Sequence, residues 1–177
     1  MAPTVQTRII GHGGSRANGA VAAAPGSVYD ICMETPEIPD DPGRRGAVAV
    51  CVRNGRMLVI RRAPSVVAPG MYCFPGGGIE NDESEENALV REFREEIGVS
   101  LRPLRRIWTC TTGWKVELSW WLGKLEAGAA PEPNPAEVES VHWFTVEEML
   151  ALPELLPSNR EFLELVTRGE IDLTSHA

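Results

Sequence analysis

The sequence has little positive charge. Its 17 lysines and arginines stand against 25 aspartates and glutamates, which gives a formal net charge of -8 at pH 7. Proteins that bind duplex nucleic acid need a broad basic surface, because contacts to phosphates supply much of the affinity. We therefore expect no duplex nucleic acid among the partners, and we expect metal ions to mediate any contact with an anionic ligand.

Cysteines and long apolar runs are also few. The cysteines form no C-x-x-C pair and have no histidine at zinc-finger spacing, so we interpret them as ordinary thiols of a reducing compartment. They are Cys32, Cys51, Cys73 and Cys110. No apolar run approaches the roughly 20 residues of a membrane span, and the start lacks the apolar core of a secretory signal. These absences predict a cytoplasmic protein with no membrane partner.

The chain divides into two parts near residue 43. Residues 1–43 are rich in glycine, alanine and proline, and repeated prolines interrupt any long helix there. We predict a flexible or extended segment over residues 1–43 and one folded domain over residues 44–177, which is long enough to bury a core. Exchange of the first segment between two subunits would produce a homodimer, which we keep as an open alternative.

Several segments of the second part have strand patterns. Apolar and β-branched runs flank Asn54-Gly55, which is a strong hairpin signal, and two further strand runs meet near Gly113. Residues 66–78 are typical of a loop with a short extended piece, and residues 138–144 are typical of another strand.

Helix signals alternate with these strands. Thr145 with Glu148, and Ser158 with Glu161, have the spacing of capping boxes and predict two helices in the last part of the chain. Strands outnumber helices but alternate with them. This order favours an α/β fold with a mixed sheet and helices packed on it.

The segment Gly77–Val99 contains eight acidic residues but only two arginines. Ser84 is a good N-cap and Gly98 suits the left-handed C′ position, so we predict a helix between them. At about 100° per residue, the apolar side chains of this helix form one stripe that must face the core. They are Leu89, Val90, Phe93 and Ile97.

Three carboxylates share another face of this helix. Glu92, Glu95 and Glu96 are spaced i, i+3 and i+4, where like charges destabilise a helix by roughly 0.2–0.5 kcal/mol per pair. Mg²⁺ or Mn²⁺ would compensate for this repulsion, because these cations prefer hard oxygen ligands. On spacing alone, the alternative is a solvated acidic face that Arg91 and Arg94 relieve.

The surrounding residues favour the first alternative. Residues 77–99 match the pattern G-x5-E-x7-R-E-U-x-E-E-x-G-U, where U is aliphatic or aromatic, and the chance of such a match is on the order of one in a million. The matching residues are Gly77, Glu83, Arg91, Glu92, Phe93, Glu95, Glu96, Gly98 and Val99. This pattern is the signature of the Nudix hydrolase family, which the chain resembles from about Ala47 to Val166.

The resemblance implies a fold and a metal site. The fold would be the family's α/β/α sandwich with a mixed β-sheet, and the cofactor would be Mg²⁺ or Mn²⁺. The implied metal ligands are Glu92, Glu95, Glu96 and the carbonyl oxygen of Gly76. Glu83 and Arg91 would pair to hold the loop against the helix, in a contact that orients Arg91 away from the metals.

The family often adds one acid from outside the motif, as a further metal ligand or as the catalytic base. Glu137, six residues before Trp143, stands where this acid is common, and Glu117 and Glu139 compete for the role. The catalytic residues that the resemblance implies are Glu83, Arg91, Glu92, Glu95, Glu96 and Glu137.

The implied reaction is metal-dependent hydrolysis of the diphosphate linkage in a nucleoside diphosphate that carries another group. Residues 71–80, MYCFPGGGIE, resemble sequences common in members that cleave nucleoside triphosphates, so we favour a nucleoside triphosphate pyrophosphohydrolase. ADP-ribose or another sugar nucleotide is the alternative substrate, although the proline typical of ADP-ribose hydrolases is absent near Trp114. No NADH-type motif follows the signature.

An alternative of another class is a regulatory domain that binds a nucleotide without cleaving it. Such domains usually lose a metal carboxylate, whereas this sequence keeps all of them. We therefore favour an enzyme with a small-molecule nucleotide or nucleotide-sugar substrate.

The sequence leaves the base-binding residues open. Aromatic residues that could stack on a base are Tyr72, Trp108, Trp114, Trp120 and Trp121. On alternating strands about half of these should instead face the core, as should Trp143. Arg61 and Arg62 end a strand near the motif loop. One of them is a candidate for a phosphate contact, and plain solvent exposure of both is the default alternative.

Overall fold

The computed structural model describes residues 43–174. The predicted N-terminal segment therefore lies outside the described residues except for Gly43, and so does the strand exchange that would form a dimer. Cys32 also lies outside them.

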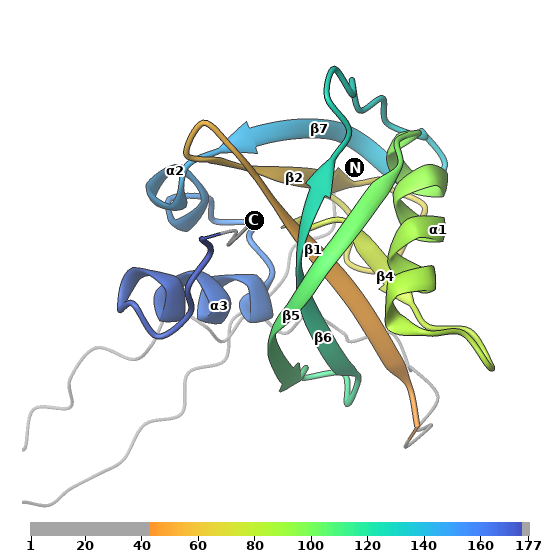
Figure 1. Cartoon of the computed structure of the whole chain (residues 1–177), viewed down its shortest axis with the longest axis horizontal. Coiled ribbons are helices and arrows are strands. Elements are labelled where there is room, and N and C mark those ends of the chain that lie inside the picture. Colours follow the sequence, from red (N-terminus) through yellow and green to blue (C-terminus); the bar gives the residue numbers. More distant parts are fainter. Residues whose placement is uncertain (1–42, 175–177) are drawn as a thin grey trace, which may run out of the picture. The chain divides into compact units, whose positions relative to one another are not determined.

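The described residues form seven strands and three helices (Figure 1). The strands are β1 (Arg45–Arg53), β2 (Arg56–Arg62), β3 (Tyr72–Cys73), β4 (Gly76–Gly78), β5 (Leu101–Thr111), β6 (Glu117–Leu125) and β7 (Val138–Phe144). The helices are α1 (Glu85–Ile97), α2 (Val146–Leu150) and α3 (Pro157–Thr167). No helix within residues 43–174 is long and apolar enough to cross a membrane.

One sheet connects these strands in the order β3-β2-β1-β6-β5, with β4 beside β1 and β7 beside β2. β1 and β6 are parallel, whereas the other pairs are antiparallel. Asn54 and Gly55 join β1 to β2 with φ angles of 52° and 73°, as the hairpin signal predicts. The mixed sheet with its helices confirms the predicted α/β fold.

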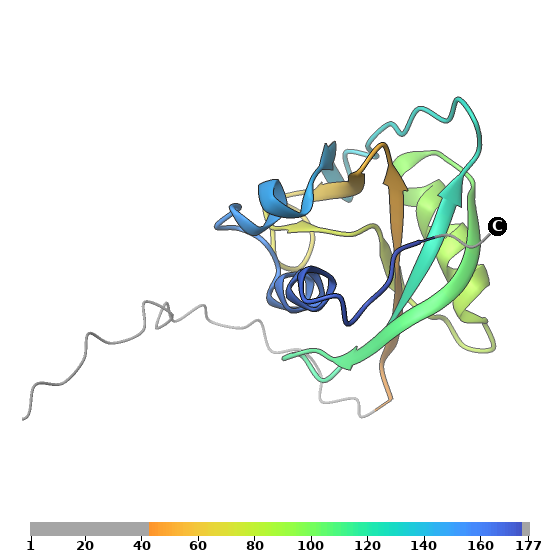
Figure 2. The same ribbon diagram turned by 60° about the vertical axis from the view of Figure 1, so that its left-hand side comes forward.

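Both faces of the sheet are covered. Along β1, Ala47 and Ala49 belong to a first core cluster with α1, whereas Val48 and Val50 belong to a second cluster with α3. This alternation follows from the two-residue period of a strand. Figures 1 and 2 both show α1 and α3 on opposite sides of β1 and β6.

α1 begins and ends as predicted. The Ser84 hydroxyl accepts a hydrogen bond from the Asn87 N–H at 3.2 Å, and Gly98 ends the helix with φ 67°. The fully buried side chains of this helix are Ala88, Leu89, Phe93 and Ile97. Val90, which we expected in this stripe, is only half-buried. The buried sector of α1 is therefore rotated toward the side that carries Glu96.

The last two helices differ in how they begin. α2 has the predicted capping box, in which Thr145 and Glu148 exchange side-chain to backbone hydrogen bonds. The capping box predicted at Ser158 is wrong, because α3 already begins at Pro157 and its N-cap, Leu156, makes no side-chain bond. Proline is favoured at the first helical position, since its ring presets φ and its missing N–H would be unpaired there.

Candidate active site

Two acidic side chains of α1 lie in the rotated, largely buried sector of the helix. Glu92 and Glu96 are one turn apart, and their exposed fractions are 12% and 5%. Glu137, in the loop between β6 and β7, meets them there. Carboxylate oxygens of these three residues lie within 4.8 Å of one another. We call Glu92, Glu96 and Glu137 the carboxylate cluster.

Backbone contacts fix the loop that carries Glu137. The Asn134 N–H donates to the carbonyl of Glu96 at 2.8 Å, and the Asn134 side-chain amide donates to the carbonyl of Glu95 at 3.0 Å. The Ala63 N–H donates to the carbonyl of Glu137 at 2.9 Å. The loop is thus tied to the end of α1 on one side and to the end of β2 on the other.

The carboxylate cluster has an unfavourable electrostatic balance. Burial raises the pKa of Glu96 to about 8, and the neighbouring charge of Glu92 adds to this effect. Burial is also the main cause that raises the pKa of Glu92. Two carboxyl groups therefore resist ionisation in the absence of a cation.

The glycines of β4 let the backbone approach these carboxylates. The Gly76 N–H donates to Glu96 at 2.9 Å, and Gly76 has φ 137°, which favours glycine. A Cβ atom on Gly77 would overlap the Glu92 carboxylate, and one on Gly76 would overlap the backbone of Ala47. Position 76 therefore needs glycine, and a side chain at position 77 would displace the Glu92 carboxylate, whereas a Cβ on Gly78 would meet open space.

Arg91 joins the acidic loop to the acidic helix. Its guanidinium donates to both oxygens of Glu83, at 3.1 and 2.9 Å, and to the carbonyl of Gly78 at 2.9 Å. The predicted Glu83–Arg91 contact is present, and this hydrogen-bonded partner lowers the pKa of Glu83. The same guanidinium also donates to Glu92 at 2.8 Å and to Glu95 at 3.1 Å. The expectation that Arg91 points away from the metal carboxylates is therefore wrong, because its several donors reach both sides.

The other predicted acids lie outside the carboxylate cluster. Glu95 is half-exposed, at 51%, and bonds Arg91 instead. Glu139 forms an ion pair with Arg61 at 2.8 Å, and Glu117 is paired in register with Thr111 and with β1. The metal roles of Glu95 and of the Gly76 carbonyl stay predictions.

The donor set of the carboxylate cluster fits a divalent cation. All three residues offer oxygen atoms, which Mg²⁺ and Mn²⁺ prefer. The raised pKa of Glu96 is the expected property of a buried carboxylate for which the nearby charge of Arg62 does not offset burial and the neighbouring acids. An added cation would supply the missing positive charge.

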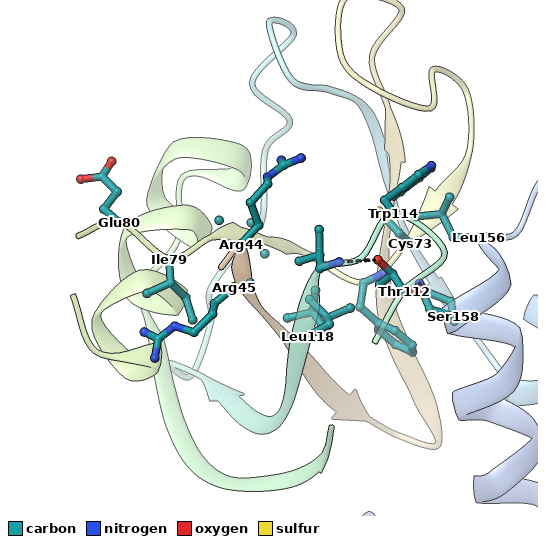
Figure 3. Close-up of a pocket in the computed structure, with 18 of the residues that line it drawn as sticks. Arg44, Arg45, Cys73, Ile79, Glu80, Thr112, Trp114, Leu118, Leu156 and Ser158 are labelled. Carbon is teal, nitrogen blue, oxygen red and sulfur yellow. Dashed lines mark hydrogen bonds between the residues drawn. The ribbon is translucent and has the colours of Figure 1, made fainter. Parts of the chain in front are cut away.

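A cavity of about 500 Å³ opens beside β4 (Figure 3). β4 forms part of its wall, so the strand that contacts Glu92 and Glu96 with one side meets the cavity with another. Residues of β1, of the β5–β6 hairpin and of the start of α3 complete the lining. The lining includes Arg44, Arg62, Phe74, Trp114 and Asn159.

The cavity separates the candidates that the sequence left open. Arg62 lines it and donates to the carbonyl of Val67 at 2.6 Å. Arg61 does not line it and is held by Glu139 and by the carbonyl of Gly70. Of the aromatic candidates, all within residues 43–174, Trp114 alone lines the cavity. Trp120 is fully buried, so a stacking role for Trp120 is wrong.

Two lining residues had no signal in the sequence. Arg44 lies at the junction with the N-terminal segment. The wrong prediction of a capping box at Ser158 gave no role to the next residue, Asn159. Asn159 is only 3% exposed, and its side-chain oxygen accepts a hydrogen bond from the Phe74 N–H at 2.9 Å. An asparagine two residues after a leucine-proline pair is not distinctive without the packing that buries it.

Fold and site together are those of an α/β protein that holds a cluster of acidic oxygen ligands beside a ligand-sized cavity. A family model for the NUDIX domain matches residues 43–166. The chain belongs to the Nudix hydrolase family, as its signature indicates.

Curated relatives share only part of their length with this chain. The NAD-capped RNA hydrolase NudC of Stutzerimonas stutzeri is 36% identical over 121 residues, which are 67% of this chain and 43% of that protein. The CTP pyrophosphohydrolase of Escherichia coli is 31% identical over 120 residues, which are 66% of this chain and 85% of that protein. The chain thus spans about half or less of the NudC proteins but most of the shorter relative.

Solved structures agree with the fold. The MutT NUDIX hydrolase from Burkholderia pseudomallei has a TM-score of 0.58 and 28% identity, over 70% of this chain and 97% of that one. An ADP-ribose pyrophosphatase from Streptococcus suis has a TM-score of 0.59 and 21% identity, over 76% of this chain and 94% of that one. At that identity the second likeness concerns the fold alone.

Proposed function

We propose that the protein is a metal-dependent pyrophosphohydrolase that cleaves the diphosphate linkage of nucleotides, with nucleoside triphosphates as its preferred substrates. The observation that carries this proposal is the carboxylate cluster, whose oxygens lie within 4.8 Å of one another. β4 connects the cluster to the cavity, because Gly76 and Gly77 contact Glu96 and Glu92 and also line the cavity.

The residues that would hold Mg²⁺ or Mn²⁺ are Glu92, Glu96 and Glu137, with Glu95 and the Gly76 carbonyl as further candidates. A divalent ion in such a site neutralises phosphate oxygens and lowers the pKa of a bound water. Glu96 and Glu92 must be ionised to bind it, so metal binding releases protons from this cluster.

The chain's own residues divide the remaining work. Glu137, which comes from the loop rather than the helix, is our candidate to accept the proton of the attacking water. Arg91 and Glu83 keep the loop before α1 in place. Arg62 lines the cavity close to the cluster, and we assign it a contact with a substrate phosphate.

The relatives support two substrate classes to different degrees. The CTP pyrophosphohydrolase of Escherichia coli is matched over 85% of its length, which favours a nucleoside triphosphate. NAD-capped RNA is the second candidate, because a NudC protein is 36% identical to this chain. The missing NADH-type motif counts against it. ADP-ribose and other sugar nucleotides complete the set to be tested.

The test is metal-dependent release of phosphate or pyrophosphate from nucleoside triphosphates, oxidised nucleotides, sugar nucleotides, ADP-ribose and NAD-capped RNA. Glu96→Gln removes one carboxylate of the cluster, and Glu86→Gln is its matched control, because Glu86 is exposed on the same helix. We expect turnover that requires Mg²⁺ or Mn²⁺ and collapses only in Glu96→Gln. Tight nucleotide binding without any turnover would replace the proposal with a regulatory nucleotide-binding domain.

A further inference from the structure

Two of the five tryptophans lie in the second core cluster or against it. Trp120 is fully buried and stacks on Phe162, with 4.5 Å between ring centroids. Trp108 packs on both of these rings, at 5.4 and 6.0 Å. Trp120 is therefore not available to a ligand, and Trp108 packs on this group and does not line the cavity.

Two other tryptophans make specific contacts away from the cavity. The Trp121 ring N–H donates to Glu85 at 2.7 Å, in the first turn of α1. Trp143 packs against the first core cluster, and the Arg53 guanidinium lies 4.7 Å from its ring centroid. Both side chains therefore have a structural role that explains them.

Trp114 differs from these four. It is half-buried at the tip of the β5–β6 hairpin and lines the cavity. Figure 3 shows it among the side chains that line the cavity, which also include Ile79 and Glu80. Packing within the protein does not explain a large aromatic residue at this place.

The hairpin that carries Trp114 is an ordered turn. The Thr112 N–H donates to the carbonyl of Val116 at 2.9 Å, and the Lys115 N–H donates to the carbonyl of Thr112 at 2.9 Å. The Val116 N–H also donates to the Thr112 hydroxyl at 3.3 Å, which Figure 3 marks with a dashed line. A side chain on such a turn loses little further freedom when a ligand packs against it.

The cavity also provides the charge that the other end of a nucleotide needs. Arg44 and Arg62 line it together with the Gly76–Gly78 strand, which contacts the carboxylate cluster. A molecule with phosphates beside that strand and an aromatic group beside Trp114 would contact both the arginines and the tryptophan of the lining.

We infer that Trp114 is the residue on which the nucleobase of the substrate stacks, an inference that rests on the proposed nucleotide-cleaving function. Stacking suits any of the common bases, because each presents an aromatic face. Trp114 thus strengthens binding of the nucleoside part without selecting one base by hydrogen bonding.

The test compares binding of two kinds of ligand by the full chain with Mg²⁺ present. The first ligands are the α,β-methylene analogues of ATP, GTP, CTP and UTP, and the second is inorganic tripolyphosphate, which has no base. Trp114→Leu keeps an apolar side chain without a ring, and Trp114→Phe keeps a ring. Trp143→Phe is the matched control for loss of a tryptophan elsewhere.

We expect Trp114→Leu to weaken binding of the nucleoside analogues by about 5- to 150-fold, and Trp114→Phe to restore most of this loss. Tripolyphosphate should bind all variants equally. Nucleotide binding should change the tryptophan fluorescence of the wild type and of Trp143→Phe but not of Trp114→Phe.

Equal binding of the analogues by Trp114→Leu and wild type would overturn the inference, and so would an equal loss of tripolyphosphate binding, which indicates a structural role. No binding of any analogue by the wild type would overturn it as well. The proposed function fails separately, if the wild type binds the analogues through Trp114 but hydrolyses no triphosphate.

Discussion

Each face of the sheet is covered by a helix, but the two faces bury different kinds of side chains. On the α3 side, the buried residues form an apolar and aromatic cluster, and its buried polar neighbour Asn159 is hydrogen-bonded to the Phe74 N–H. On the α1 side, Leu89 and Phe93 pack in the same way, but Glu96 is buried beside them.

The two sides therefore differ in what their buried polar groups contribute to stability and to function. A buried polar group costs little when it is hydrogen-bonded, as Asn159 is, whereas a buried carboxylate costs more unless a charge compensates it. Glu96 accepts one hydrogen bond from Gly76 and lies beside two other acids, and the charge of Arg62 offsets its burial only in part. The α3 side therefore contributes stability, and the α1 side gives up some stability for a ligand site.

The largest expected effect is on the α3 side. Phe162→Ala removes a fully buried ring that stacks on Trp120 and should reduce the free energy of unfolding by about 3–5 kcal/mol. Urea denaturation at neutral pH measures this change, and Phe162→Leu should lose clearly less. A loss below 1 kcal/mol, on the order of an exposed substitution, would contradict the role of this cluster.

On the α1 side, the expected effect is on activity instead of stability. Glu92→Gln should reduce kcat by about a hundredfold or more, because even indirect partners of a metal ligand contribute about 10- to 100-fold. The free energy of unfolding in EDTA should stay the same or rise, since a buried charge is removed. If the activity fell only because less protein was folded, the claim that Glu92 acts in function and not in stability would be wrong.

The expected effect at Arg91 is intermediate, because Arg91 bonds the carboxylates of Glu83, Glu92 and Glu95 and holds the loop. Arg91→Gln should reduce kcat/KM by about 10- to 100-fold, and Arg91→Lys should not restore it, since lysine lacks the forked donors. Arg94→Gln, on the exposed face of the same helix, is the control and should have little effect. Full rescue by lysine would mean that only the charge matters.

The last effect is a pH dependence of stability that is confined to the metal-free protein. Burial raises the pKa of Glu96 from 4.5 to about 8, so the folded metal-free protein holds a proton that the unfolded chain loses between these pH values. Stability in EDTA should therefore fall as the pH rises from about 5 to 8, by up to about 1.4 kcal/mol per pH unit. The difference between wild type and Glu96→Gln isolates this contribution. An unchanged difference over that pH range would show that Glu96 is not perturbed.

Local signals made much of α1 predictable. Ser84, Gly98 and the spacing of Glu83 to Arg91 act within one helix and its adjoining turn, and the structure has each contact. The hairpin at Asn54-Gly55 is equally local. Contacts between residues that lie close in the sequence could thus be predicted without knowledge of the fold.

Long-range packing decided the rest. Glu137 and Asn159 meet their partners only when loops and helices far apart in sequence come together. Glu95 has the same helical spacing as the cluster residues but faces Arg91, because the buried sector of α1 is rotated toward Glu96. Several aromatic residues of the sequence could stack on a nucleobase, and only the position of the cavity distinguishes Trp114 among them.

The most direct test of the central claim is a calorimetric titration of Mn²⁺ into the metal-stripped protein. We expect the wild type and Glu86→Gln to bind Mn²⁺ with the same affinity, and Glu96→Gln to bind it at least about tenfold more weakly. Binding to the wild type should also release protons, which appears as a dependence of the heat on the buffer. Equal Mn²⁺ binding by Glu96→Gln and wild type, or no binding by either, would contradict the claim that the carboxylate cluster is a metal site.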